Sequence, residues 1–328
     1  MMKPLLAAAL AATFGAALIS AAPSHAQTFP SRPISIVVPF APGGPTDVIA
    51  RALAEHMRTT LGQSVVVENI AGANGNVGGA RVARATPDGH TIAIGHWSTH
   101  VVNGAVYPLT YDLLRDFEPV SLISSNAYLI VAKNAVPATD LKSFIAWLRA
   151  NPDRASEGTA GAGSPQHVAG VFFQNATGTR FQFIPYRGAA PAMLDLVSGN
   201  IDLIIDDPTS SLPQVRAGKI KAFAVTAERR LAAAPDIPTT DEAGLPGFYF
   251  SRWHALWAPR ATPKEVIAVL NAAVSAALAD KQIKTRLAGL GQDIYPPERR
   301  TPEALGAFHK AEIAKWWPII KAAGIKAE

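Results

Sequence analysis

The chain contains no cysteine among its 328 residues. It therefore has no disulfide, no thiolate metal site, no cysteine nucleophile and no cysteine that could carry a lipid. Charged residues are also few, at 17%, whereas 48% of the residues are hydrophobic. This balance supplies enough apolar material for a substantial core and excludes a disordered chain. The length is that of about two domains.

Long apolar runs are missing except near the N-terminus, where residues 5–22 form one. Lys3 precedes this run, and Ser24-His25-Ala26 follows it as a small-residue cleavage site. These are the three parts of an export signal. A retained membrane anchor is the alternative, because the run is close to the minimum of about 18 residues for a span. We expect residues 1–26 to be a signal peptide and the mature protein to fold in the bacterial periplasm.

Strong charge of either sign is also lacking. The 30 basic residues minus Lys3 leave 29 against 25 acidic residues, a formal charge of +4 for the mature chain. The basic residues are scattered singly or in pairs, without the stripe that nucleic-acid binding requires. We expect no nucleic-acid partner, and the small positive bias suits anionic ligands only as weak steering.

Nucleotide and hydrolase motifs are absent as well. Gly161 and Gly163 are followed by Pro165, so they form no dinucleotide fingerprint, and no P-loop lysine follows them. The nucleophile-elbow pattern Gly-x-Ser-x-Gly does not occur. Ser164 and His167 lie three residues apart on one helical turn, a placement that rarely forms a Ser-His pair. We expect no cofactor and no enzymatic activity.

A metal site is weakly indicated by His96 and His100, which are four residues apart. No glutamate lies between them and no adjacent carboxylate completes a zinc set. Hydrogen-bond donation to an anion, or simple packing, is the better interpretation, and we expect no metal.

Short β-branched runs alternate with helical patterns along the chain. The expected strands are residues 34–40, 64–69, 91–96, 129–133, 180–186, 201–206, 221–226 and 254–259. The expected helices are residues 45–61, 140–150, 166–177, 189–198, 263–279 and 301–321. This alternation predicts an α/β fold with parallel sheets, buried on both faces.

A β-rich segment, a glycine-rich turn and a helix follow one another twice, at residues 36–46 and 158–169. The repetition predicts two similar lobes that face each other. We place the crossings between lobes near residues 124–126 and 245–252. Lobe 1 would then comprise residues 27–126 plus 248–328, and lobe 2 residues 127–247.

The first turn ends a strand and opens a helix. Its residues are Phe40, Ala41, Pro42, Gly43, Gly44, Pro45 and Thr46. Proline suits the first helical position, and the glycines let several N–H groups point outward at the positive end of the helix dipole. Such a turn can bind a carboxylate. The alternative is a Pro-Gly turn in which Thr46 and Asp47 merely cap the helix.

The second turn repeats this logic with Ala160, Gly161, Gly163 and Ser164, and hydroxyl groups such as that of Ser164 add possible donors. Two anion-binding turns, one in each lobe, are what a clamp for a diacid requires. A flexible surface loop is the alternative for this second turn.

Further candidates follow other strands. His96 and Trp97 lie just past a strand, at the edge where open α/β sheets bind ligands. Asp206 ends a strand beside Asp207, where a carboxylate holds a ligand group or caps the next helix. Arg187 could pair a second ligand carboxylate or form a structural salt bridge. Trp253 and Trp257, which flank His254, either line a cleft or pack in the core.

An ordered succession of short motifs matches a known family over nearly the whole mature chain. The motifs are residues 29–34, 38–47, 61–63, 66–69, 86–89, 184–188, 198–202, 216–219, 258–259 and 262–263. With them the sequence resembles the substrate-binding proteins of tripartite tricarboxylate transporters, also called Bug-type receptors. The bulky His96, Trp97 and His254 depart from the family pattern.

This resemblance implies a type II periplasmic-binding-protein fold, with a ligand cleft between two lobes joined by crossing strands. It implies that main-chain N–H groups of residues 41–46 hold one ligand carboxylate, and that residues 160–164 hold the ligand from the other lobe. Asp206 aligns with an aspartate that faces the ligand in some members.

We therefore expect a monomeric receptor that closes on a small organic carboxylate and delivers it to the membrane permease subunits of such a transporter. The ligand is a di- or tricarboxylate, an aromatic acid or an acidic amino acid. A periplasmic hydrolase or lyase using the same cleft is the alternative, and a sensor subunit for the same ligand is a third possibility.

Overall fold

The structure is a computed structural model and describes residues 29–326 apart from 41, 162 and 187–188. The expected signal peptide lies outside these residues. The described strands are β1 (Ile34–Val38), β2 (Val65–Asn69), β3 (Thr91–His96), β4 (Phe117–Ala127), β5 (Leu129–Lys133), β6 (Ser156–Thr159), β7 (Gln182–Pro185), β8 (Leu203–Asp206), β9 (Ile220–Val225), β10 (Ser251–Pro259) and β11 (Asp293–Ile294).

Helices alternate with these strands. They are α2 (Pro45–Leu61), α3 (Asn76–Ala83), α4 (Asn103–Val106), α5 (Leu141–Ala150), α6 (Pro165–Thr177), α7 (Ala189–Ser198), α8 (Pro208–Arg216), α9 (Lys264–Ala279), α10 (Lys281–Gly289) and α11 (Pro302–Ala322). Three shorter helical segments are η2 (Ala73–Gly75), η3 (Ser98–Val102) and η4 (Pro297–Arg299).

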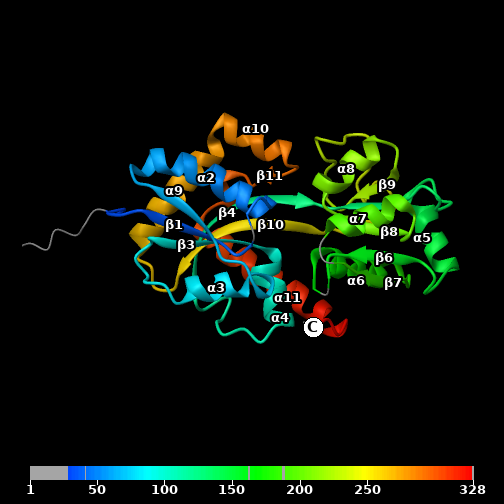
Figure 1. Cartoon of the computed structure of the whole chain (residues 1–328), viewed down its shortest axis with the longest axis horizontal. Helices are drawn as coiled ribbons and strands as arrows, with labels where there is room; N and C mark the ends of the chain where they lie inside the picture. Colours follow the sequence, from blue (N-terminus) through cyan, green and yellow to red (C-terminus); the bar gives the residue numbers. More distant parts are fainter. Residues whose placement is uncertain (1–28, 41, 162, 187–188, 327–328) are drawn as a thin grey trace, which may run out of the picture.

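The first sheet has six strands in the order β11-β4-β10-β3-β1-β2. Its side chains alternate between two clusters, because successive residues of a strand point to opposite faces. Ile34, Ile36 and Val38 pack in a cluster with α2 and α9, whereas Val37 joins the cluster that includes Trp316 of α11. Figure 1 shows α2 and α9 on one side of this sheet and α3 and α11 on the other. The sheet is thus buried on both faces, as its apolar strands predict.

The second sheet has five strands in the order β7-β6-β8-β5-β9. Leu129 and Val131 of β5 pack in the cluster that includes α7 and α8. Ile130 of the same strand packs in the cluster that includes α5 and α6. This sheet too is therefore sandwiched between helices.

The chain passes between the sheets on adjacent strands. β4 belongs to the first sheet up to Ala127, and β5 begins the second sheet at Leu129. β10 returns to the first sheet at Ser251 and pairs with β4. Figure 1 shows two lobes, the second built from the green and yellow-green segments and joined to the first beside β4 and β10. The predicted two-lobe α/β fold is confirmed. The lobe boundaries stay predictions.

The sheets are mixed rather than wholly parallel, which corrects one expectation. β1 pairs in parallel with β2 and β3, but β10 runs antiparallel to β3 and β4. β5 likewise runs antiparallel to β8 and β9. β5 and β10 are the strands at which the chain enters a sheet from the other lobe instead of through a helix on its face, and the short β11 is also antiparallel to β4.

No single helix in the described part of the chain is both long and apolar enough to cross a membrane. The pair α9 and α10 passes that test only when joined, and the two helices are bent by 73°.

Candidate functional site

The first turn is held by a carboxylate of the protein itself. The Gly43 N–H donates to Asp47 Oδ2 over 2.9 Å, and Asn69 Nδ2 donates to Asp47 Oδ1 over 2.9 Å. Arg51 Nε also donates to Asp47 Oδ2. The Gly43 amide is therefore already used, although α2, whose N-cap residue is Gly44, has no side-chain cap hydrogen bond. The amides of Thr46 and Asp47 belong to the first helical turn, which has no acceptors within its own helix.

Gly43 has a φ of +87°, and a Cβ built there would have no atom within 4 Å. The turn thus needs a glycine for its backbone conformation, and its surface at this residue borders open space. Gly44, in contrast, has a φ of −76° that any residue can adopt. A side chain at Gly44 would therefore not strain the backbone.

The amides of the second turn also have acceptors within the protein. The Gly161 N–H donates to Thr159 Oγ1, and the Gly163 N–H donates to His167 Nδ1 over 3.2 Å. The Ser164 N–H donates to the Gly161 carbonyl. Backbone amides at this turn are therefore engaged in fixing the loop. They differ from the free N–H groups that the sequence predicts.

Ser164 caps α6 instead of forming a nucleophile. Its Oγ accepts from the backbone N–H of His167 over 3.3 Å, while the His167 ring accepts from Gly163. The imidazole therefore accepts a hydrogen bond from the loop backbone, whereas the hydroxyl contacts the backbone N–H of the same histidine. This arrangement gives the serine a structural role as a helix cap.

His96 and His254 lie together beside the first turn. The ring of His96 stacks on Phe40 at a centroid distance of 4.7 Å, and it meets the ring of His254 edge-on at 5.7 Å. His254 Nε2 shares a hydrogen bond with Thr46 Oγ1 over 3.1 Å. Burial and the nearby charge of Arg252 hold the pKa of both histidines well below the usual value. Both rings are therefore neutral near pH 7.

Asp206 and Asp207 make different contacts. Asp207 caps α8, because its Oδ1 accepts from the Thr209 N–H over 2.9 Å. Asp206 is 1% exposed and accepts from Gln166 Nε2 over 3.1 Å and from the Ser210 hydroxyl. Burial raises the pKa of Asp206 to about 6, and the charge of Asp207 adds to the effect.

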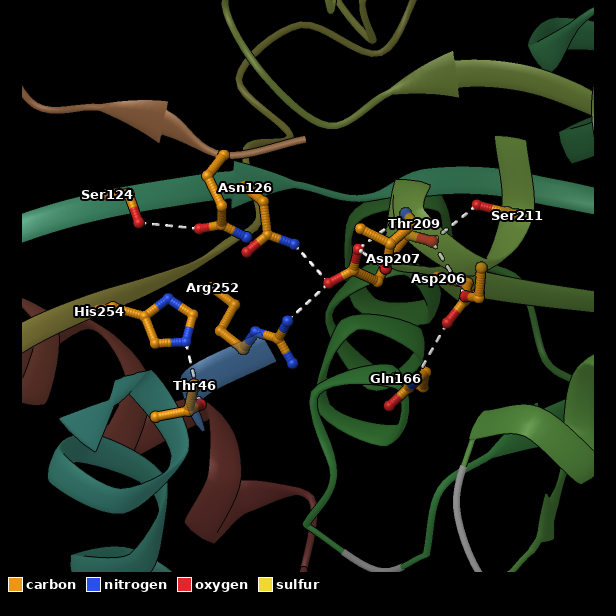
Figure 2. A network of polar contacts seen from close by, with 12 residues as sticks. Thr46, Ser124, Asn126, Gln166, Asp206, Asp207, Thr209, Ser211, Arg252 and His254 are labelled. Atoms are coloured by element: carbon orange, nitrogen blue, oxygen red, sulfur yellow. Dashed lines mark hydrogen bonds and ion pairs between the residues drawn. The ribbon is translucent and has the colours of Figure 1, made fainter. Parts of the chain in front are cut away.

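Arg252 completes the polar network, and the sequence interpretation did not assign it a role. Its Nη2 donates to Asp207 Oδ2 over 2.6 Å, and Asn126 Nδ2 donates to the same oxygen over 2.5 Å. Figure 2 shows Arg252 between His254 on one side and Asp207 on the other. The available signal in the sequence was a cation, Arg252, near the start of β10, whose other residues are mostly aromatic or apolar.

The tryptophans belong to the core. Trp97 is fully buried and packs edge-on against Phe250 and Trp316. Trp253 donates through Nε1 to Glu312, and Trp257 stacks on His100 at 3.6 Å. The packing alternative describes all three of these tryptophans.

The remaining predicted residues lie at the following positions. Phe40 precedes the turn, and Pro45 begins α2 at the first helical position, as expected. Pro42 and Ala160 lie in the two turns. Ala41 and Arg187 fall outside the described residues. Within the described part of the chain, no group of three or more histidine, aspartate or glutamate side chains is placed to hold a metal ion.

The geometry therefore gathers neutral histidines, two buried carboxyls, two amide side chains and the guanidinium of Arg252 between the starts of α2 and α6 (Figure 2). These groups donate and accept hydrogen bonds, and Arg252 supplies positive charge. Such a set can orient and hold an organic anion.

Comparisons with known proteins point the same way. The model of the tripartite tricarboxylate transporter family receptor matches residues 49–325. BugT of Bordetella pertussis is 34% identical over 308 residues, covering 93% of this chain and 94% of that protein. MatC of Rhodopseudomonas palustris, solved with bound malate, is 39% identical with a TM-score of 0.77, covering 89% of this chain and 100% of that chain. A second R. palustris protein, solved with adipate, is 34% identical with a TM-score of 0.79, covering 91% and 100%.

Proposed function

We propose that this chain, which belongs to the tripartite tricarboxylate transporter receptor family, captures a small aliphatic dicarboxylate between its lobes and delivers it to a membrane permease. The observation that carries the proposal is the likeness to two relatives solved with malate and adipate. Both ligands are open-chain diacids. The receptor family supports a carboxylate ligand and a periplasmic location, and we infer that residues 1–26 direct the export.

The candidate site supports capture without chemistry. One acid group of the ligand would rest at the start of α2, near Thr46, where the helix dipole and first-turn amides favour an anion. The wall opposite would be formed by Gln166 and Asp206 of the second lobe, which contact each other. Hinge motion about β4 and β10 would enclose the ligand.

We infer that the protein is not an enzyme and acts as a monomer. Ser164 serves as a helix cap, and His167 turns its ring nitrogen to the loop backbone. This arrangement supports a binding role over the hydrolase alternative.

The direct test is calorimetric titration of the purified mature chain with succinate, malate, adipate, citrate, benzoate and glutamate. We expect saturable binding of at least one aliphatic diacid and a matching rise in the melting temperature. A ligand at 100 times its dissociation constant adds about 2.7 kcal/mol to the free energy of unfolding.

Recovery of the ligand separates a receptor from an enzyme. After incubation overnight, NMR spectra of the filtrate should show the diacid unchanged in structure and amount. Consumption of the acid, or of an ester or amide of it, would support the hydrolase or lyase. Failure of every acid to bind would refute the receptor proposal.

A further inference from the structure

Arg252 is a cation in the interior whose hydrogen-bonding capacity is mostly unused. Its side chain is 15% exposed, and the contact with Asp207 uses Nη2 alone. Its Nε is buried and has no partner among the described residues. A guanidinium group carries five N–H donors in a planar fork that fits a carboxylate through two parallel bonds. The structure thus holds a buried charged donor whose Nε has no acceptor among the described residues.

Arg252 lies where the two lobes join. It lies on β10 opposite Asn126 of β4, and these are the strands beside the two crossings. His254, two residues along and on the same face of the strand, contacts Thr46 at the start of α2. In Figure 2 the guanidinium points toward the space between the start of α2 and α6.

Asp207 does not depend on Arg252 for its other contacts. Its Oδ2 also accepts from Asn126, and its Oδ1 accepts from the Thr209 N–H and hydroxyl. Arg252 can therefore also donate to a ligand carboxylate, because Asp207 keeps its hydrogen bonds from Asn126 and Thr209. The neighbouring histidines, His96 and His254, cannot supply this charge, because burial lowers their pKa and leaves both rings neutral.

We propose that Arg252 is a specificity-determining residue, which binds the second acid group of a ligand whose first acid group lies at the start of α2. This inference rests on the proposed function and refines it. An acid with only one carboxylate would leave the guanidinium fork without its second acceptor. The site therefore selects diacids over monoacids of the same length.

Matched ligand pairs test this selectivity. Calorimetry should compare adipate with hexanoate, and succinate with butyrate, on wild type and on Arg252→Gln. We expect the diacid that wild type binds to weaken about 10- to 100-fold in Arg252→Gln, since a hydrogen bond to a charged group contributes about 1.5–3 kcal/mol. The affinity for the matched monoacid should change by less than about threefold, because a group that the monoacid does not contact has only a small effect on its binding.

Two further variants keep the test decisive if Arg252→Gln is unstable. Arg252→Gln/Asp207→Asn removes both charges together, so that Asp207 is not left in the interior as a carboxylate without its cation. It should fold and still fail to distinguish diacids from monoacids. Arg252→Lys keeps the charge without the fork and should restore part of the selectivity. Arg260→Gln, an exposed residue just after β10, is the matched control and should bind as wild type does.

The outcomes separate this inference from the proposed function. Equal weakening of diacid and monoacid would make Arg252 a structural residue and overturn the inference, while leaving the receptor function in place. A wild-type protein that binds monoacids as tightly as diacids would do the same. A wild-type protein that binds no acid at all would refute the function itself.

Discussion

Asp206 shows how one buried side chain couples the site to pH. In the folded protein the Asp206 carboxyl keeps its proton up to about pH 6, whereas the ordinary pKa of an aspartate is 3.8. Between these values the folded state binds more protons than the unfolded state, so ionisation of Asp206 lowers stability as pH rises. Above about pH 6 this penalty is complete. The ionised Asp206 carboxylate, held beside Gln166, thus lowers the free energy of unfolding at neutral pH.

Asp206→Asn removes this penalty. A shift of about two units corresponds to roughly 2–3 kcal/mol, so the variant should gain about that much relative to wild type between pH 4 and pH 7. Urea unfolding at several pH values measures the difference, in which titration of the buried histidines cancels. Asp153→Asn, at an exposed carboxylate, controls for the loss of one charge. A difference that stays constant from pH 4 to 7 would contradict the role given to Asp206.

At the scale of elements, Asp47 joins the first turn, α2 and β2 through its contacts with Gly43, Arg51 and Asn69. Burial opposes its ionisation, but the hydrogen bonds from Arg51, Gly43 and Asn69 prevail and lower the pKa of Asp47 to about 2. Its stabilising contribution is therefore present above about pH 4 and is lost as pH falls toward 2.

Asp47→Ala should loosen this junction. It leaves the Gly43 amide without its acceptor and removes one of the two acceptors of Asn69 Nδ2, which also donates to the Phe40 carbonyl. The loss of the Gly43 acceptor costs about 1–3 kcal/mol of unfolding free energy. Diacid affinity should fall as well, because Gly43 fixes the turn before α2. Denaturant unfolding and calorimetry measure the two effects. Arg51→Gln, at a side chain that is 48% exposed, should lose less than about 1 kcal/mol. Equal losses in the two variants would assign the effect to the ion pair alone.

Apolar elements could be predicted from the sequence because their own side chains define them. The expected helices at residues 45–61 and 189–198 agree in both bounds with α2 and α7, and the expected strands at residues 91–96 and 129–133 agree with β3 and β5. Local pattern suffices where the apolar side chains of an element repeat at the period of a helix or follow one another along a buried strand.

The expected strands did not include β4 and β6, which carry buried polar residues. β4 carries Ser124 and Asn126, which are buried against Gln292 and Asp207, and β6 carries the fully buried Glu157. These partners lie far along the chain, so no local pattern identifies them. Arg252 escaped prediction for the same reason, since its partner is 45 residues away.

The turns were located correctly, but the amides of Gly43, Gly161 and Gly163 are engaged within the protein, which the sequence interpretation did not foresee. Asp47 lies four residues after Gly43, and His167 lies four after Gly163. An acceptor at this spacing after each glycine was a readable signal that the turn completes its own hydrogen bonds.

At the scale of the whole molecule, an aromatic row connects the lobes. Phe172 of α6 stacks on Phe248 at 4.7 Å and meets Trp316 of α11 edge-on at 5.3 Å. Trp316 in turn packs against Trp97, which directly follows His96 in the chain. The row thus runs from the second lobe, across the first, to the residue beside the candidate site. It explains why Trp97 is buried here instead of facing a ligand.

Phe172→Ala should weaken the contact between the lobes more than either lobe itself. Each aromatic pair contributes about 0.5–1.5 kcal/mol beyond its buried area, so the ligand-free protein should populate more open arrangements. Small-angle scattering should then give a larger radius of gyration without ligand, and the diacid affinity should fall about 3- to 10-fold as closure becomes costlier. Saturating diacid should restore the wild-type radius, because the ligand selects the closed form. Phe172→Leu, which keeps apolar volume, should lie between the two. If Phe172→Ala lost stability while its scattering and affinity matched wild type, the row would serve only to pack the second lobe, and closure would depend on the strands at the crossings alone.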